Sequence, residues 1–428
     1  MKFLKQLSLY TLVGIISAGI NFFIMPLLSH YLTPSDYGLL SLFNTYVTIL
    51  IPIVSVYAYS LLNVEYFKQK EKGIYASLFT SIQIIPFVNV LILGIVTAIF
   101  YKHFASLLEL KNLSVHWGYT ILIITLFAIF YEQFIEYLVI RKRAKTFALF
   151  SFLKVGIEVL LTFYFVVYKR YNWEGRIYSW LITSVVFFIV SVIYVYKEGL
   201  LKGKINFGYI KEGLVFGAPL VLHGVGKFVI NQSDRLFIAK MVSLQEAGIY
   251  NIGYTIGSLV MIVVNAFFNF YSPYLMERLS DITEARKLEI VKMSYLYIFG
   301  SILLLILISL FAPLFFRYLI DRRYESGTRY VFWVALGYCF WGGYMLFSGF
   351  IFFFKKNRIL AWLAVFNIIS NLLFNYFFIM KFGAIGAAYA TALSFFLLLI
   401  LIAYQANKLV QLPWFNFKLI FAGVRKNI

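Results

Sequence analysis

The chain has 428 residues, of which 62% are hydrophobic and 20% aromatic but only 13% charged, and its mean hydropathy is +0.85. These values exclude a soluble globular domain, so we predict an integral membrane protein. The formal charge of +20 would suggest nucleic acid as a partner of a soluble chain. Here, however, the Lys and Arg residues fall in short clusters between apolar runs, where they set membrane topology. No nucleic-acid partner is therefore expected.

Apolar runs long enough to cross about 30 Å of hydrocarbon as helices recur along the whole chain. Strands are not expected, because transmembrane strands alternate apolar and polar residues over about ten positions. The first run follows a basic start, but it is too long for a signal peptide and is expected to be retained. The predicted fold is all-α and polytopic, with twelve transmembrane helices at residues 7–31, 37–63, 76–101, 117–139, 147–168, 177–196, 213–239, 247–273, 293–316, 330–354, 359–380 and 385–406.

The distribution of basic residues predicts the orientation. With a cytoplasmic N-terminus, the inner segments hold 24 Lys and Arg residues and the outer loops hold ten, Arg176 among them. Cytoplasmic loops carry the excess of Lys and Arg in membrane proteins. Both termini are therefore expected in the cytoplasm.

An internal repeat relates the two halves of the chain. Shifted by 210 residues, the segment 32–40 lies over 242–250, and the same shift pairs Asn21 with Asn231. Farther along the chain, a shift of 211 pairs Gly175 with Gly386. Each half holds six spans, so both halves enter the membrane in the same sense, as in transporters built from parallel repeats. We predict two six-helix lobes, residues 1–205 and 206–428, around a central cavity. Asp36 and Glu246, equivalent in the repeat, are expected to cap the amides of a helix start.

The predicted span 213–239 carries a polar stripe. His223, Lys227, Asn231 and Asp234 are spaced by four, four and three residues, which places them on one helix face. A charge at the bilayer centre costs about 2.5 to 3.5 kcal/mol, so the stripe is expected to face protein or a water-filled cavity. Two hypotheses follow. The charges either form structural ion pairs with other helices, or line a cavity through which a polar substrate passes.

Further candidates join this stripe. Arg235 lies beside it and either lines the cavity or extends to the membrane interface. Lys154 and Glu158, four residues apart on one span, either neutralise each other or face the cavity. The predicted cavity residues are Lys227, Arg235, Asn231, His223, Lys154 and Asn21, and the predicted ion-coupling carboxylates are Asp234 and Glu158.

Other polar residues have structural interpretations. Glu132 and Glu136 are expected to pair with the basic segment 141–145 that follows their span. Asn367, Asn371 and Asn375, spaced by four, are expected to form hydrogen bonds between helices.

Enzymatic and cofactor motifs are missing from the sequence. Gly226-Lys227 lacks the other residues of a phosphate-binding loop, and no nucleophile elbow or zinc-binding HExxH occurs. A single cysteine excludes an internal disulfide, and the four histidines show no metal-ligand spacing. We therefore expect neither an enzyme nor a bound cofactor or metal.

Three segments carry a family likeness. GIISAGINFFIMPLLSHYLTPSDYGLLSLF near the start, GAPLVLHGVGKFVINQSDRLFIAKMVSLQEAGIYNIGYTI in the centre and FGAIGAAYATALS near the end resemble the polysaccharide and oligosaccharide (O-antigen-type) flippases. These belong to the multidrug, oligosaccharidyl-lipid and polysaccharide exporter superfamily. The most specific part is the pair Asp234 and Arg235 followed by Gly248 and Tyr250.

The resemblance implies a two-lobed transporter that moves undecaprenyl-diphosphate-linked oligosaccharide outward across the bacterial inner membrane by alternating access. It also implies a coupling ion, H⁺ or Na⁺, and as partners membrane lipid and other membrane proteins of polysaccharide assembly. One alternative is an ion-coupled multidrug or small-molecule extruder of the same superfamily. A second is a membrane glycosyltransferase or polysaccharide polymerase, which would need a large outer loop, whereas the predicted outer loops are short.

Overall fold

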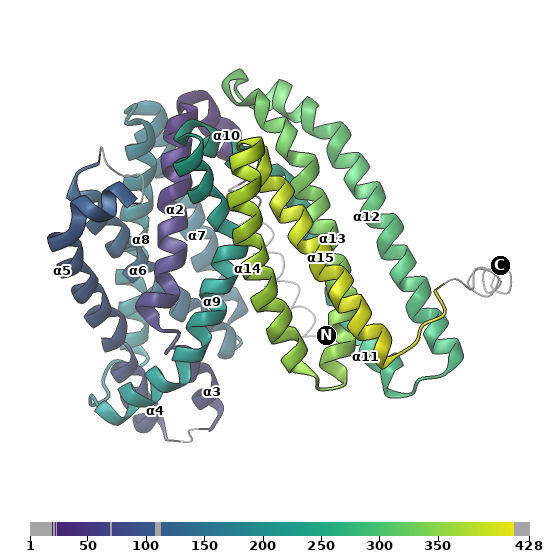
Figure 1. Cartoon of the computed structure of the whole chain (residues 1–428). Coiled ribbons are helices and arrows are strands. Elements are labelled where there is room, and N and C mark those ends of the chain that lie inside the picture. Colours follow the sequence, from purple (N-terminus) through teal and green to yellow (C-terminus); the bar gives the residue numbers. More distant parts are fainter. Residues whose placement is uncertain (1–18, 20–21, 23, 69–70, 108–112, 415–428) are drawn as a thin grey trace. The chain divides into compact units, whose positions relative to one another are not determined.

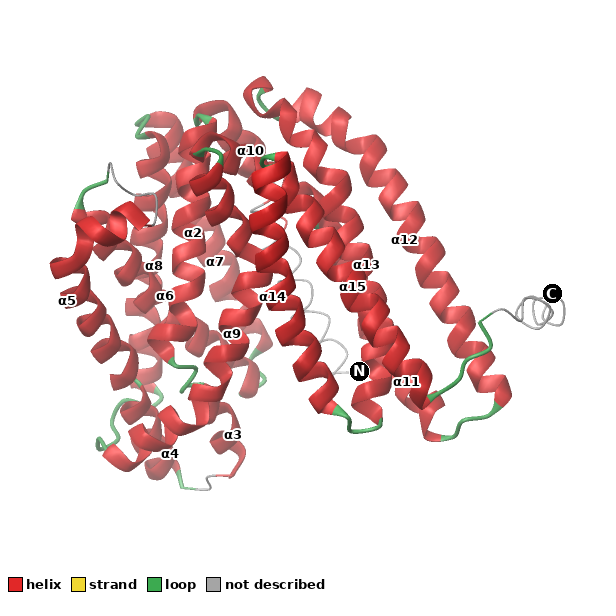
Figure 2. Cartoon of the chain, in the orientation of Figure 1, coloured by secondary structure: helices red, strands yellow, loops and turns green. Residues whose placement is uncertain are grey.

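The computed structural model describes residues 19, 22, 24–68, 71–107 and 113–414 (Figure 1). Throughout these residues the regular elements are helices joined by loops (Figure 2), which confirms the all-α class. In the first part of the chain they are α2 (Pro34–Ser55), α3 (Ser60–Lys68), α4 (Lys72–Ile82), α5 (Ile84–Leu107), α6 (Val115–Ile140), α7 (Ala144–Thr162), the π-helix η1 (Phe163–Tyr168), α8 (Asn172–Lys197) and α9 (Phe207–Met241). In the second part they are α10 (Leu244–Gly257), α11 (Leu259–Ser280), α12 (Glu284–Leu319), the 3₁₀-helix η2 (Arg322–Gly327), α13 (Thr328–Phe353), α14 (Asn357–Phe382) and α15 (Ile385–Leu409).

Eleven helical segments of the described residues are long and apolar enough to cross a membrane. Each overlaps one of the predicted spans from 37–63 onward, so the helices predicted there are confirmed. The predicted first span, 7–31, lies mostly outside the described residues. The total of twelve therefore stays a prediction.

The chain divides into two compact units, residues 1–240 and 241–428. In the first unit, α6 packs against α2, α3, α5, α7 and α8. In the second, α13 packs against α10, α11, α12 and α15, and α14 lies along α15. The predicted lobe boundary at 205/206 rests on the internal repeat of the sequence, whereas the two compact units are defined by contacts between residues. The predicted lobes therefore stay a prediction.

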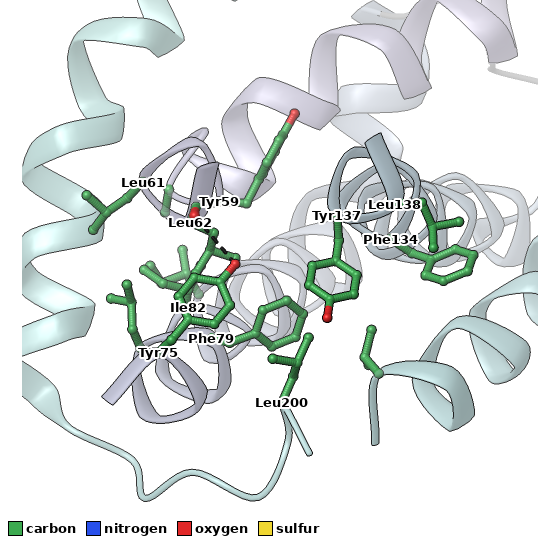
Figure 3. Packing of buried hydrophobic residues seen from close by; sticks show 14 residues of the cluster. Tyr59, Leu61, Leu62, Tyr75, Phe79, Ile82, Phe134, Tyr137, Leu138 and Leu200 are labelled. Carbon is green, nitrogen blue, oxygen red and sulfur yellow. Dashed lines mark hydrogen bonds between the residues drawn. The ribbon is translucent and has the colours of Figure 1, made fainter. Parts of the chain in front are cut away.

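In the first unit, several helices contribute aromatic and aliphatic side chains to one buried core (Figure 3). The rings of Tyr75 in α4 and Tyr137 in α6 lie against Tyr66 of α3, at centroid distances of 5.4 and 6.3 Å. Leu200, after α8, and Tyr209, in the first turn of α9, belong to the same core. Aromatic pairs of this kind contribute about 0.5 to 1.5 kcal/mol each beyond their buried area. The core thereby anchors the start of α9, the helix that carries the polar stripe.

A turn after α2 brings α9 into close contact with the first unit. Val56 and Tyr57 adopt the left-handed conformation, with φ of 50° and 49°, and α2 ends there. A Cβ atom at Gly217 of α9 would lie 2.0 Å from the carbonyl oxygen of Val56 and 2.8 Å from the amide nitrogen of Ala58. Only glycine permits this approach of helix to turn. The first half of α9 is therefore packed tightly on the turn.

The helix starts at α2 and α10 share their capping geometry. The hydroxyl of Thr33 accepts from the Asp36 amide at 3.2 Å, and the hydroxyl of Ser243 accepts from the Glu246 amide at 3.0 Å. The predicted cap by Asp36 is confirmed, because its carboxylate accepts from the Thr33 amide at 2.9 Å. For Glu246 the prediction is wrong, because its carboxylate accepts from the Tyr330 hydroxyl of α13 at 2.6 Å. A hydroxyl cap thus recurs at the predicted shift of 210 residues.

The later part of the repeat also has a structural counterpart. A Cβ atom at Gly175 would lie 3.0 Å from the backbone carbon of Phe165, and one at Gly386 would lie 2.2 Å from the carbonyl oxygen of Phe378. In both places a helix start packs closely against the end of the helix before it. The close approach explains why glycine occupies both positions.

Candidate functional site

Helix α9 presents the predicted polar stripe within the first unit. His223 and Lys227 are exposed, Asn231 is half-buried and Asp234 is buried. Among the described residues, no hydrogen bond or ion pair involves the Lys227 ammonium. An ammonium without a partner is costly in hydrocarbon, so Lys227 is expected to contact water rather than lipid tails.

The C-terminal end of the stripe is held by local bonds. Arg235 donates from Nη1 to Asp234 Oδ1 and to the carbonyl oxygen of Asn231, both at 2.8 Å, and its side chain is 4% exposed. The Asn231 amide in turn donates to the carbonyl oxygen of Lys227 at 2.7 Å. Arg235 is thus buried beside Asp234 instead of extending to an interface. Asn21, the repeat partner of Asn231, lies outside the described residues.

Lys154 and Glu158 interact, as one of the two hypotheses predicts. The Lys154 Nζ lies 3.6 Å from Glu158 Oε2, and Arg176 of α8 is closer, with 2.7 Å between its Nη2 and Glu158 Oε1. Arg176 also donates to the Thr162 hydroxyl at 2.8 Å. The Lys154 ammonium lies 5.2 Å from the ring centroid of Tyr131 in α6, a cation–π distance. Glu158 is therefore shared by two cations.

Sequence reasoning missed Arg176, which it counted among outer-loop residues. Helix α8 begins at Asn172, five residues before the predicted span, so Arg176 lies at the helix start. The short connection from η1 to α8 returns the chain beside α7 and brings Arg176 back to Glu158. Two adjacent antiparallel spans with a short loop are the signal that could have suggested this pair.

The predicted pairing of Glu132 and Glu136 with the basic segment after α6 is wrong. Arg141 and Arg143 form ion pairs with Glu198, at 3.7 and 2.7 Å. The hydrogen bond that Arg143 donates to Glu198 raises the pKa of Arg143 above its usual range. The end of α8 supplies the acidic partner because α6 and α8 pack together.

The two carboxylates of α6 lie among residues of other helices in the first unit. Asn63 of α3 donates to Glu136 Oε2 at 2.8 Å. The charges of Lys154, in α7, and Lys227, in α9, both act on the Glu132 carboxylate. The stripe on α9 and the charges on α6 and α7 therefore belong to one region, which the spacing of residues along single helices does not reveal.

We call this region the charge cluster. It joins α6, α7, α8 and α9 and contains three cations and three carboxylates, namely Lys154, Arg176, Lys227, Glu132, Glu136 and Glu158. Arg176 is engaged by Glu158, whereas Lys227 is exposed and Lys154 holds Glu158 only at 3.6 Å. Cations with such loose partners can bind an incoming anion, for which ammonium groups are suitable donors.

The asparagines of α14 form a hydrogen-bonded ladder in the second unit. Asn375 donates to the side-chain oxygen of Asn371 at 3.0 Å, and Asn371 donates to the Ser394 hydroxyl of α15 at 3.3 Å. These side chains and that of Asn367 are buried. The bond of Asn371 to α15 confirms the prediction for that residue, whereas Asn375 bonds within α14 and the buried Oδ1 of Asn367 has no hydrogen-bond partner among the described residues.

Two solved structures share the fold. A multidrug resistance transporter of the MATE family and MOP superfamily, in its inward-facing conformation, aligns with a TM-score of 0.68 and 14% identity over 98% of this chain and 96% of its own. The lipid II flippase MurJ, in an inward closed conformation, aligns with a TM-score of 0.67 and 17% identity over 93% of this chain and 87% of its own. The chain is therefore a multi-pass membrane protein with the fold of these two structures.

The sequence comparisons identify the family. The model of the family described as polysaccharide biosynthesis protein matches residues 3–278. Protein 1 of the Lsg locus of Haemophilus influenzae is 22% identical over 382 residues, which cover 86% of this chain and 89% of the relative. The chain belongs to the polysaccharide biosynthesis protein family, as the sequence resemblance predicts.

Proposed function

We propose that this protein is a flippase for undecaprenyl-diphosphate-linked oligosaccharide, which it moves from the cytoplasmic to the outer leaflet of the bacterial inner membrane. Its cargo would serve the synthesis of a surface polysaccharide such as O-antigen. Membership in the polysaccharide biosynthesis protein family supports a role in the synthesis of a polysaccharide. The fold shared with a lipid II flippase supports a lipid-linked cargo.

The exposed ammonium of Lys227, on a membrane-spanning helix and without a partner among the described residues, carries the proposal. A diphosphate is the anionic part of a lipid-linked sugar, and cationic donors bind such groups through charge-assisted hydrogen bonds. Lys154 adds a second ammonium from α7 in the same charge cluster. A polar headgroup could thus be neutralised inside the bilayer while its lipid tail stays among the lipids.

The proposed mechanism is alternating access between two six-helix lobes, residues 1–205 and 206–428, with twelve spans and a central cavity. Both termini would lie in the cytoplasm, in keeping with the excess of basic residues in the inner segments. Transport would be coupled to H⁺ or Na⁺, and other membrane proteins of polysaccharide assembly would act beside it. His223, Asn231, Arg235 and Asn21 are proposed to line the path with the two lysines, and Asp234 and Glu158 are the proposed coupling carboxylates.

Deletion of the gene tests the proposal. Lipid-linked repeat units should accumulate on the cytoplasmic side, measured by mass spectrometry of extracted lipids and by their protection from an external glycosidase. Surface polysaccharide should disappear, while the glycosyltransferases stay active in isolated membranes. A plasmid copy should restore the polysaccharide. If the deletion strain displays normal polysaccharide, the proposal is wrong.

The second candidate is a multidrug or small-molecule extruder, which the fold similarity to the MATE transporter favours. An extruder of cationic drugs needs an excess of acidic groups, whereas the charge cluster contains as many cations as carboxylates. Greater sensitivity of the deletion strain to cationic drugs, with its polysaccharide intact, would replace the first proposal by this one.

A further inference from the structure

Glu132 differs from Asp234 and Glu158, the two proposed coupling carboxylates, in having no direct partner for its charge in the part of the chain that the structure describes. Glu158 lies 2.7 Å from Arg176, and Asp234 accepts from Arg235 at 2.8 Å. Among the described residues, Glu132 takes part in no ion pair or hydrogen bond, although it lies half-buried in the membrane-spanning helix α6. It is therefore the carboxylate of the charge cluster whose charge is least satisfied by direct contacts.

The surroundings of Glu132 show where its charge acts. The charges of Lys154, in α7, and Lys227, in α9, act on it, and Glu136 follows it one turn later on α6. The Lys154 ammonium also lies 5.2 Å from the ring centroid of Tyr131, the residue before Glu132. From the turn after α2, the phenols of Tyr57 and Tyr59 are also within its electrostatic reach. A Cβ atom at Gly224 of α9 would lie 2.5 Å from the Tyr57 ring, so the turn of α9 that precedes Lys227 packs on the same residues.

We propose that Glu132 is an internal counter-ion, which competes with the anionic headgroup of the cargo for Lys154 and Lys227. This rests on the proposed function, because it assumes that these lysines bind the cargo's diphosphate. When Glu132 is ionised, it neutralises part of the charge of the two ammonium groups. When it takes up a proton, both ammonium groups become available to the incoming anion.

Proton uptake and anion binding are therefore linked. Reciprocal linkage requires that a proton which strengthens anion binding be bound more strongly once the anion is present.

Glu136 is excluded from this role by its environment. Its carboxylate already accepts a hydrogen bond from Asn63 at 2.8 Å, whereas Glu132 has no such partner among the described residues.

Binding of farnesyl diphosphate to the purified full-length protein in nanodiscs tests the proposal, with neutral farnesol as the reference for the lipid part. At pH 8, Glu132→Gln should bind farnesyl diphosphate about tenfold more tightly than the wild type, within the usual range of coupling between sites. The ratio of the two dissociation constants should fall towards one as the pH is lowered, because protonation of wild-type Glu132 removes the same charge that the Gln substitution removes. Titration of the probe itself cancels in this ratio.

Glu136→Gln is the matched control, since it removes the same charge from the same helix one turn away. It should leave the dissociation constant within about twofold of the wild type, because the Glu136 carboxylate is already engaged by Asn63. If Glu132→Gln does not accumulate as folded protein, Glu132→Ala removes the same carboxylate and serves the same comparison.

Three results decide between the possibilities. Tighter binding in Glu132→Gln alone, with the predicted change with pH, supports the counter-ion. Equal binding in wild type and Glu132→Gln at pH 8, or an equal effect of Glu136→Gln, overturns it while leaving the proposed function in place. If no variant binds farnesyl diphosphate better than farnesol, the anionic cargo fails, and the counter-ion inference fails with it.

Discussion

The guanidinium of Arg176 lies 2.7 Å from the carboxylate of Glu158, and the two residues come from different helices. The side chain of Glu158 is 14% exposed and that of Arg176 is 18% exposed, so the pair is shielded from water. Arg176 joins the start of α8 to α7, and it leaves Lys154 only loosely engaged by the same carboxylate. Both the stability of the first unit and the availability of Lys154 depend on this contact.

Removing Arg176 should destabilise the first unit. In Arg176→Ala, Glu158 retains only Lys154 at 3.6 Å. Loss of one charged hydrogen-bond partner costs about 1 to 3 kcal/mol, so thermal unfolding of the purified protein should begin at a lower temperature. The double variant Arg176→Ala/Glu158→Gln should recover part of the loss, because no unpaired charge is left. Arg170→Ala, at an exposed position before α8, is the control and should unfold like the wild type. Additive losses in the double variant would contradict the pairing.

Gly217 should not tolerate a side chain. The added Cβ of Gly217→Ala would meet the carbonyl oxygen of Val56 at 2.0 Å, and backbone atoms cannot move aside as a flexible side chain can. Overpacking of this kind costs about 1 to 3 kcal/mol, so the yield of folded protein and its thermal stability should both fall. Gly156→Ala in α7 is the matched control, since nothing lies within 4 Å of its new Cβ. Equal stability of the two variants would show that α9 does not pack on this turn as described.

Lys227 should act through its charge. Lys227→Ala should abolish complementation of surface polysaccharide in the deletion strain while leaving membrane abundance unchanged, and Lys227→Arg should retain part of the activity. Lys240→Ala, which removes an exposed charge at the end of the same helix, should complement fully. If Lys227→Ala transports normally, or is lost from the membrane, its role is structural.

Reporter fusions test the orientation. Fusions after Lys145 and Lys204 should behave as cytoplasmic, because the inner segments carry the excess of basic residues. A fusion after Arg323 should behave as external. Arg323 is preferable to its neighbour Tyr324, whose side chain is fully buried in the second unit. The opposite pattern would reverse the predicted topology.

The sequence by itself determined the features that depend on local periodicity. From residue 37 onward, each long apolar run predicts a helix that the structure contains. The reason is that a backbone in hydrocarbon must satisfy its hydrogen bonds internally. The spacing of His223, Lys227, Asn231 and Asp234 predicts one helix face, since a helix repeats every 3.6 residues. Thr33 and Ser243 cap equivalent helices because a hydroxyl cap needs only the next few residues.

Only the tertiary structure decided which charges face each other. Glu158 and Arg176 lie on different helices, as do Glu132 and Lys227, so no period of a single helix relates the members of either pair. Pairing between helices depends on how each helix is rotated and on where it begins, as the earlier start of α8 at Asn172 shows. The sequence could list the carboxylates of the first unit, but the packing of α6, α7, α8 and α9 determines that Glu158 is engaged by Arg176 while Glu132 lies free of direct partners among the described residues.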